Sequence, residues 1–328
     1  MAIITNACIR EIVVLTSIKR AALLTILPLM TTLVIFAGAH RAIAEPYVQG
    51  PTFCEECHKE EAKVWATTKH YETYRTMHKS KDAKKIVKAV GGKKSMKRNK
   101  NCNVCHYSKE QKKPKSKSKV KYGPSCESCH GPSSEWETIH ADYGGKNVKR
   151  EDEAPAHKIK RVADSTAAGL IWARMTYDIA ANCMKCHGLA RSEISGKAFG
   201  AMLKGGHPIN QSFEIVMFSQ GKMRHWLKPR SPAQLAKLFV AGQAAKLVSA
   251  AEMAGKSKNK KYKAAQMQRV TDAKAALQGV PGAAALINSP SDAAARAMMK
   301  AIGDQDISGL VGARIPCAGS DKKNLWQC

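Results

Sequence analysis

Cys54-Glu-Glu-Cys57-His58 is the stretch that decides the fold, because its pattern Cys-x-x-Cys-His returns three more times. The later copies are Cys102-Asn-Val-Cys105-His106, Cys126-Glu-Ser-Cys129-His130 and Cys183-Met-Lys-Cys186-His187, and we call the four copies motifs one to four. Two thiols three positions apart can each bond a vinyl group of one porphyrin, and the next histidine can bind the iron as its proximal ligand. The pattern therefore predicts four covalently attached c-type haems, with His58, His106, His130 and His187 as iron ligands.

Zinc binding is the main alternative, because paired Cys-x-x-Cys units also form zinc ribbons. A zinc ribbon does not require a histidine after each second cysteine, and all four copies have one. Zinc ribbons and iron–sulfur sites also suit a reducing compartment, whereas the start of this chain predicts export. Four matches to one motif are much more specific than a single match, so haem attachment is favoured.

The first 44 residues have the pattern of a secretory signal peptide. A basic start precedes an apolar stretch over residues 21–39, which leads to the small-residue cleavage site Ala42-Ile43-Ala44. An uncleaved membrane anchor is the alternative, since about 20 apolar residues can span a bilayer. Threonines and Pro28 interrupt the stretch, so we predict cleavage before Glu45 and a periplasmic protein.

Export also fits the cysteine count. Eight of the eleven cysteines lie in the motifs, and Cys8 lies in the signal segment. The remaining two, Cys317 and Cys328, can form a disulfide in an oxidising compartment. Their spacing permits this bond but does not establish it.

The chain is strongly basic, with a formal net charge of +28, and much of that charge lies between Lys79 and Lys121. Such a surface attracts acidic partners at low salt. Nucleic acid would be the usual partner of a cytosolic protein this basic, but export and an aromatic content of 6% argue against it. We expect an acidic redox protein, as donor or acceptor, or an anionic membrane surface. The lysine-rich segment is either such a docking patch or a solvated, partly mobile insertion.

The predicted fold class is mainly α, in two regions after the signal. Residues 45–228 suggest short helices joined by loops such as Gly123-Pro124, with few large aliphatic side chains, so the haems themselves are expected to form much of the core. Residues 229–328 are Ala-rich and predict a helical bundle with no chemistry of its own. Apolar residues at helical spacing mark its three expected helices: Leu235, Leu238, Phe239, Ala245 and Met253; Met267, Val270 and Leu277; and, after an N-cap at Ser289-Pro290, Ala295, Met298, Met299 and Ile302.

The second axial ligand decides whether a haem only carries electrons or can bind a substrate. Two imidazoles close the iron, whereas a five-coordinate iron keeps an open position. Outside the motifs, the mature chain offers six histidines for this role, namely His70, His78, His140, His157, His207 and His225.

The order of these residues resembles the tetrahaem cytochrome c-554 family over roughly residues 50–228. The resemblance rests on motif one followed by Lys59, Trp65 and His70, and on motif three followed by Gly131-Pro132 and His140. It implies that His70 binds the third haem and His140 the first. The histidine after Phe213-Glu214, His225, is implied as ligand of the fourth haem. The second haem of the family lacks a distal protein ligand, but here His78, His157 and His207 remain as candidates. His207-Pro208, beside Gly205-Gly206, is the most suggestive of the three.

Three functions are compatible with this pattern. The leading hypothesis is an electron carrier, for which the resemblance implies a hydroxylamine oxidoreductase as donor. The second is an enzyme that reduces a small nitrogen species such as nitric oxide at a five-coordinate second haem. The third is a conductive homo-oligomer in which a histidine such as His207 binds a neighbour's haem. The carrier is favoured because no acid, base or nucleophile forms a recognisable catalytic group outside the motifs.

Overall fold

The computed structural model describes residues 45–209, 213–219 and 230–315. The predicted signal segment, His225, Trp226, Cys317, Cys328 and the predicted domain boundary at residue 228 lie outside the described residues. Within the described residues, no helix has the length and apolar character needed to cross a membrane. The fold is mainly α-helical, as the sequence predicts.

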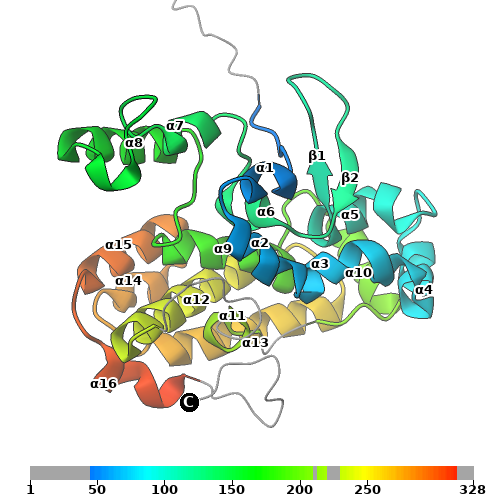
Figure 1. Cartoon of the computed structure of the whole chain (residues 1–328). Helices are drawn as coiled ribbons and strands as arrows, with labels where there is room; N and C mark the ends of the chain where they lie inside the picture. Colours follow the sequence, from blue (N-terminus) through cyan, green and yellow to red (C-terminus); the bar gives the residue numbers. More distant parts are fainter. Residues whose placement is uncertain (1–44, 210–212, 220–229, 316–328) are drawn as a thin grey trace, which may run out of the picture. The chain divides into compact units, whose positions relative to one another are not determined.

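Short helices make up the part of the chain that holds the motifs (Figure 1). They are α1 (Pro51–Glu55), α2 (Lys59–Ala66), α3 (Lys69–Thr76), α4 (Lys81–Val90), α5 (Lys100–His106), α6 (Cys126–His130), α7 (Glu137–Ala141), α8 (Pro155–Ala167), α9 (Thr176–His187), α10 (Gly196–Lys204) and α11 (Ile215–Ser219). Motif one spans the end of α1 and the start of α2, and motifs two, three and four end α5, α6 and α9. Each motif histidine therefore lies at a helix terminus.

The lysine-rich segment is partly helical and partly a hairpin. In α4, Ala83 and Val87 are buried and the helix packs against α10, while its lysines face solvent. Strands β1 (Ser108–Glu110) and β2 (Lys119–Tyr122) pair antiparallel, and the hairpin carries seven further lysines on its strands and on the loop between them (Figure 1). The segment therefore exposes its charge from ordered elements that are anchored by a few apolar residues.

The C-terminal helices are α12 (Pro232–Met253), α13 (Lys260–Leu277), α14 (Ala283–Asn288), α15 (Asp292–Ile302) and α16 (Ser308–Val311). Ser231 and Gln234 form a capping box at the start of α12, and Pro232 occupies its first turn. Most residues of helix α12 are buried, which is typical of a central helix, and the helix packs against both α13 and α9. The described residues 45–209, 213–219 and 230–315 consequently belong to one compact unit.

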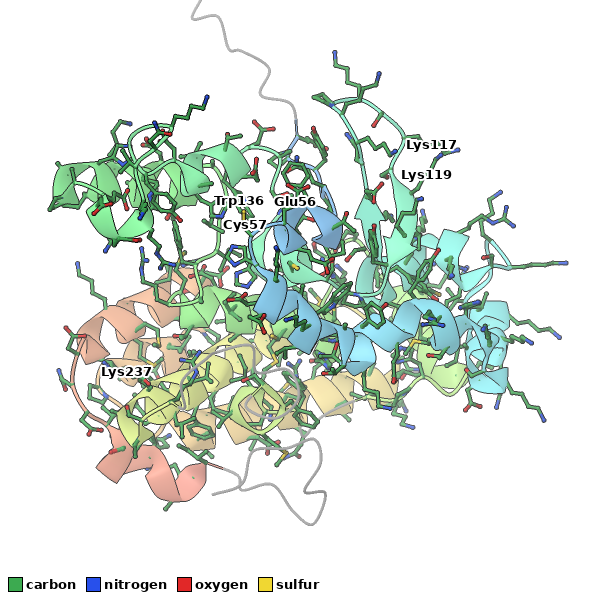
Figure 2. The ribbon with its side chains drawn as sticks, viewed as in Figure 1. Glu56, Cys57, Lys117, Lys119, Trp136 and Lys237 are labelled. Atoms are coloured by element: carbon green, nitrogen blue, oxygen red, sulfur yellow. The ribbon has the colours of Figure 1, made fainter. Side chains whose placement is uncertain are left out.

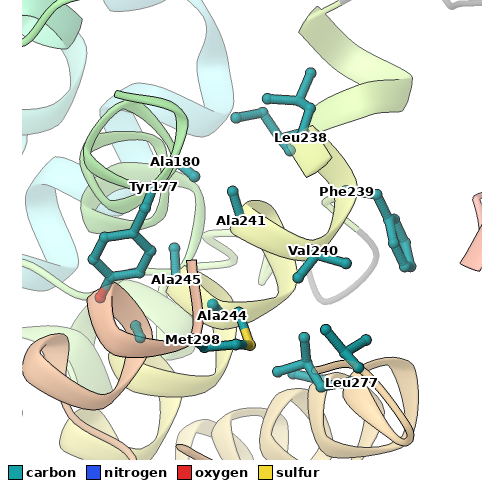
Figure 3. Close-up of a cluster of buried hydrophobic side chains, with 14 of the residues drawn as sticks. Tyr177, Ala180, Leu238, Phe239, Val240, Ala241, Ala244, Ala245, Leu277 and Met298 are labelled. Carbon is teal, nitrogen blue, oxygen red and sulfur yellow. The ribbon is translucent and has the colours of Figure 1, made fainter. Parts of the chain in front are cut away.

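The main apolar core lies where α12 meets its neighbours. Figure 3 shows one cluster of side chains from four helices: Tyr177 and Ala180 from α9, Leu238, Phe239, Val240, Ala241, Ala244 and Ala245 from α12, Leu277 from α13 and Met298 from α15. Of these, Ala180, Val240, Leu277 and Met298 are fully buried. The C-terminal region thus shares its core with the helix that carries motif four.

Two sequence predictions about this region are wrong. Met267 is 48% exposed, and the buried face of α13 consists instead of Tyr262, Ala265, Gln266, Arg269, Ala273 and Leu277. The inward face holds polar side chains because they bond to the end of α9, as described below. In addition, α15 is capped by Ser291 rather than Ser289. Its predicted core residues Ala295, Met298 and Ile302 are fully buried.

Gly123 precedes motif three at a close backbone approach. A Cβ at this position would overlap the carbonyl oxygen of His70, and a backbone atom cannot move away as a flexible side chain would. We expect Gly123→Ala to lower the free energy of unfolding of the haem-loaded protein by about 1–3 kcal/mol in a denaturant titration. Gly255→Ala is the matched control, because nothing lies within 4 Å of its added Cβ. Equal stabilities of the two variants would contradict the packing at Gly123.

Candidate haem-binding site

The fold brings cysteines of different motifs into contact. Cys54 lies beside Cys126, Cys129 beside Cys183, and Cys105 beside Cys186, close enough for each thiol to shift the pKa of its neighbour. These contacts link motif one to three, three to four, and four to two. Haems attached at these cysteines are therefore neighbours in the order one, three, four, two, which differs from their order in the chain.

Three of the motif histidines each face a histidine from elsewhere in the chain. Ring centroids lie 6.3 Å apart for His58 and His140, 6.0 Å for His106 and His207, and 5.9 Å for His187 and His70. Two imidazoles that bind one metal ion through nitrogen atoms at about 2 Å have centroids about 6 Å apart. Each pair therefore leaves a gap of the size that one iron fills.

Backbone carbonyls orient several of these imidazoles. The Nδ1–H of His207 donates to the carbonyl of Pro208 at 2.8 Å, and that of His140 donates to Glu137 at 2.5 Å. His130 of motif three donates in the same way to Ile171 at 2.8 Å. A hydrogen bond at Nδ1 fixes the tautomer and leaves Nε2 with its lone pair available for a metal.

Burial also keeps the imidazoles in the neutral form that binds iron. Desolvation lowers the pKa of both His106 and His187 to about 4, with smaller contributions from neighbouring histidines. The pKa values of His70, His140 and His207 are lowered mainly by burial as well. These side chains therefore present lone pairs, not protons, to the gap at neutral pH.

One histidine expected from the resemblance at the third haem lies beside a different motif. His70 was expected at the third haem but faces His187 of motif four. His140 lies opposite His58, as the resemblance implies. His225, expected at the fourth haem, lies outside the described residues. Trp65 donates from Nε1 to the carbonyl of Pro124 (2.9 Å) and so ties the end of α2 to the segment just before motif three.

The second motif departs from the family pattern. His207, at the turn after α10, faces His106, so the described structure supplies a candidate distal ligand there. The other two candidates have different surroundings. His157 bonds Glu153 at 2.9 Å, and the buried Nδ1 of His78 has no hydrogen-bond partner. Among the described ring contacts, neither residue faces a motif histidine.

Aromatic side chains support the paired imidazoles. Trp136, labelled with Cys57 in Figure 2, packs edge-on against His140 at 5.1 Å between centroids. Phe213 stacks on His187 at 4.1 Å with an interplanar angle of 10°. The sequence singled out Phe213 only as a marker for the late histidine and missed this contact.

Glu127, inside motif three, is a further residue that sequence reasoning missed. Its buried carboxylate accepts hydrogen bonds from the backbone N–H groups of Gln49, Gly50 and Ser133 and from the Ser133 hydroxyl. Four donors satisfy a carboxylate fully. This carboxylate ties the segment before motif one to motif three, which agrees with the thiol contact between Cys54 and Cys126.

The donor set fits c-type haem. Each motif offers two thiols close to a helix end, and three of them offer two imidazoles across an iron-sized gap. A zinc ribbon needs several protein ligands that converge on one point. In the described residues, no group of three or more histidine, cysteine or acidic side chains converges in this way.

The first prediction from this site concerns motif two. In the ferric protein, His207→Ala should convert one low-spin haem to high-spin, because the sixth ligand of that iron is removed. Electron paramagnetic resonance measures the conversion, integrated against haem content. His157→Ala is the matched control and should leave all signals unchanged. An unaltered spectrum of His207→Ala would show that His207 is not a ligand.

The pairing of His70 with His187 is tested by a double variant. If the two imidazoles bind one iron, His70→Ala and the double variant His70→Ala/His187→Ala both remove one low-spin signal. If His70 belongs to the third haem, the double variant removes two. The count of low-spin signals per four haems distinguishes the two pairings.

Comparison with known proteins supports this interpretation of the site. Residues 53–131 match the family described as cytochrome c554 and c-prime. Cytochrome c-554 of Nitrosomonas europaea is 30% identical over 135 residues, which is 36% of this chain and 54% of that protein. The match thus spans about half the length of that relative, and no solved structure matches the chain. Over residues 53–131, which hold the first three motifs, the chain is therefore similar to the family of cytochrome c554 and c-prime.

Proposed function

We propose that this protein is a periplasmic tetrahaem c-type cytochrome that transfers electrons between redox partners. The observation that carries the proposal is the pairing of motif histidines with distant histidines, above all His106 with His207. An iron with two imidazoles has no open position, so it exchanges electrons without binding a substrate.

The chain's own residues would arrange the haems for this task. When bound, each haem supplies a one-electron ferric–ferrous couple. The eight cysteines hold the porphyrins, and the contacts between Cys54 and Cys126, Cys129 and Cys183, and Cys105 and Cys186 set which haems are neighbours. Electrons would enter and leave through a continuous series of haems rather than through four isolated ones.

The surface charge suggests the kind of partner. The hairpin β1–β2 projects exposed lysines, of which Lys117 and Lys119 are labelled in Figure 2. Opposite charges accelerate the encounter of two proteins at low salt. An acidic redox protein is therefore the proposed donor or acceptor, and the resemblance suggests a hydroxylamine oxidoreductase as donor.

The two other hypotheses receive less support. A nitric oxide reductase needs an open second haem, but His207 faces His106 across the gap. A conductive assembly through His207 needs that histidine to reach a neighbouring molecule, whereas here it faces a histidine of its own chain. The carrier remains the function that the geometry supports best.

The deciding experiment is an electron paramagnetic resonance spectrum of the ferric protein, integrated against iron and haem content. We expect four haems per chain and low-spin signals from at least three of them, because motifs one, two and four each hold a second imidazole that faces the motif histidine. His207→Ala provides the reference for one added high-spin haem. Two or more high-spin haems in the unaltered protein would reject the carrier and favour a ligand-binding enzyme.

A further inference from the structure

The inward face of α13 is polar where it meets the motif-four helix. Tyr262, Gln266 and Arg269 lie at positions i, i+4 and i+7, on one side of the helix, and are at most 1% exposed. Polar side chains of this size are rarely buried without partners. Their partners therefore show what this face does.

All three side chains bond to the chain directly after His187. Tyr262 donates its hydroxyl to the carbonyl of Leu189 at 2.7 Å, and Gln266 donates Nε2 to Gly188 at 2.9 Å. Arg269 donates Nη1 to Gly188 at 3.3 Å. The last carbonyls of a helix lack partners within the helix, so α13 satisfies the end of α9.

The guanidinium of Arg269 also contacts motif four itself. Its Nη2 lies 3.3 Å from the sulfur of Met184, the residue after Cys183, and 3.2 Å from the hydroxyl of Ser249. A Cβ on Gly188 would overlap Nη2, so the group packs directly against the motif. A positive charge thus lies beside the segment that binds the fourth haem.

No carboxylate balances this charge. None of the ion pairs among the described residues includes Arg269, and its hydrogen-bond partners are neutral. A guanidinium stays protonated even when buried. Lys246, a second buried cation nearby, differs because Asp272 and Glu214 lie close enough to affect it. A buried charge without a partner destabilises a fold. Hydrogen bonds to the end of α9 therefore do not by themselves explain why an arginine occupies this position.

A fixed positive charge changes the reduction potential of a nearby haem. Ferric haem becomes ferrous by accepting one electron, which lowers its net charge by one. A fixed cation stabilises the reduced form relative to the oxidised form, and in a buried site salt screens this effect little. A nearby cation therefore raises the reduction potential.

We propose that Arg269 raises the reduction potential of the haem at motif four, and that the C-terminal helical region thereby makes this haem an electron acceptor within the series. Motif four lies between motifs three and two in the order of thiol contacts. A higher potential there draws electrons inward from either neighbour. The inference rests on the proposed function, because it requires haem at motif four.

The test is a spectroelectrochemical titration of the four-haem protein and its variants, fitted with four one-electron components. Arg269→Gln removes the charge but keeps hydrogen-bonding atoms for Gly188. One component should move to lower potential, with a roughly tenfold higher ratio of oxidised to reduced haem at a fixed potential, or about 59 mV. Arg269→Lys keeps the charge and should restore most of the shift.

Arg314→Gln is the matched control. Arg314 also donates to carbonyls at a helix end, those of Ala276 and Gln278, but its side chain is exposed. Its partner Ala276 lies about two turns along α13 from Arg269. Its loss should leave all four components in place. A purely structural role of Arg269 would change the unfolding midpoint and not a potential.

A second variant keeps the test decisive if Arg269→Gln does not fold. Ser249→Asp places a carboxylate beside Nη2 and neutralises the guanidinium in place, so it should lower the same component. Four unshifted components in either folded, four-haem variant would overturn the role of Arg269 and leave the carrier function intact. A haem count of three in the unaltered protein, with motif four empty, would instead overturn the proposed tetrahaem function.

Discussion

The geometry of an iron with two axial imidazoles is the constraint on which this structure depends. The two rings must lie about 6 Å apart on opposite sides of one point, and a chain can satisfy this only if two segments are held at fixed positions. In three of the motifs, a histidine at a helix end meets a histidine from a turn or another helix at this spacing. The surrounding short helices, carbonyl hydrogen bonds and aromatic contacts serve to fix those positions.

The second motif shows how a small local feature changes the chemistry that a haem can perform. His207 follows Gly205-Gly206 at the end of α10, and Gly206 has a positive φ of 97° that favours glycine. This turn, together with the hydrogen bond from His207 to Pro208, directs the imidazole toward His106. With a second imidazole at this position, a haem at motif two would keep no open coordination position for a substrate.

The C-terminal region packs against the helix that carries motif four and does not form a core of its own. Helix α12 shares its apolar core with α9, and α13 presents Tyr262, Gln266 and Arg269 to the end of that helix. The region therefore supports the fourth motif both by packing and by charge. The inward face of α13 is polar, so the spacing of its apolar residues wrongly predicts that Met267 is buried and does not predict that Arg269 is buried.

The sequence by itself determined the chemistry of attachment and the mainly helical fold. A Cys-x-x-Cys-His motif is local, so five consecutive residues specify the thiols and the proximal ligand without reference to the rest of the chain. The central, apolar α12 and the buried face of α15 also followed from spacing, because helical periodicity is a local property.

Only the tertiary structure decided which histidines meet, which motifs are neighbours and which charges are buried beside them. His70 and His187 lie far apart in the chain, and no local pattern states that they share a gap. The same holds for Glu127 with Gly50 and for Arg269 with Met184. Such contacts arise from packing between distant segments. Because that packing depends on the whole core, no short sequence pattern predicts them.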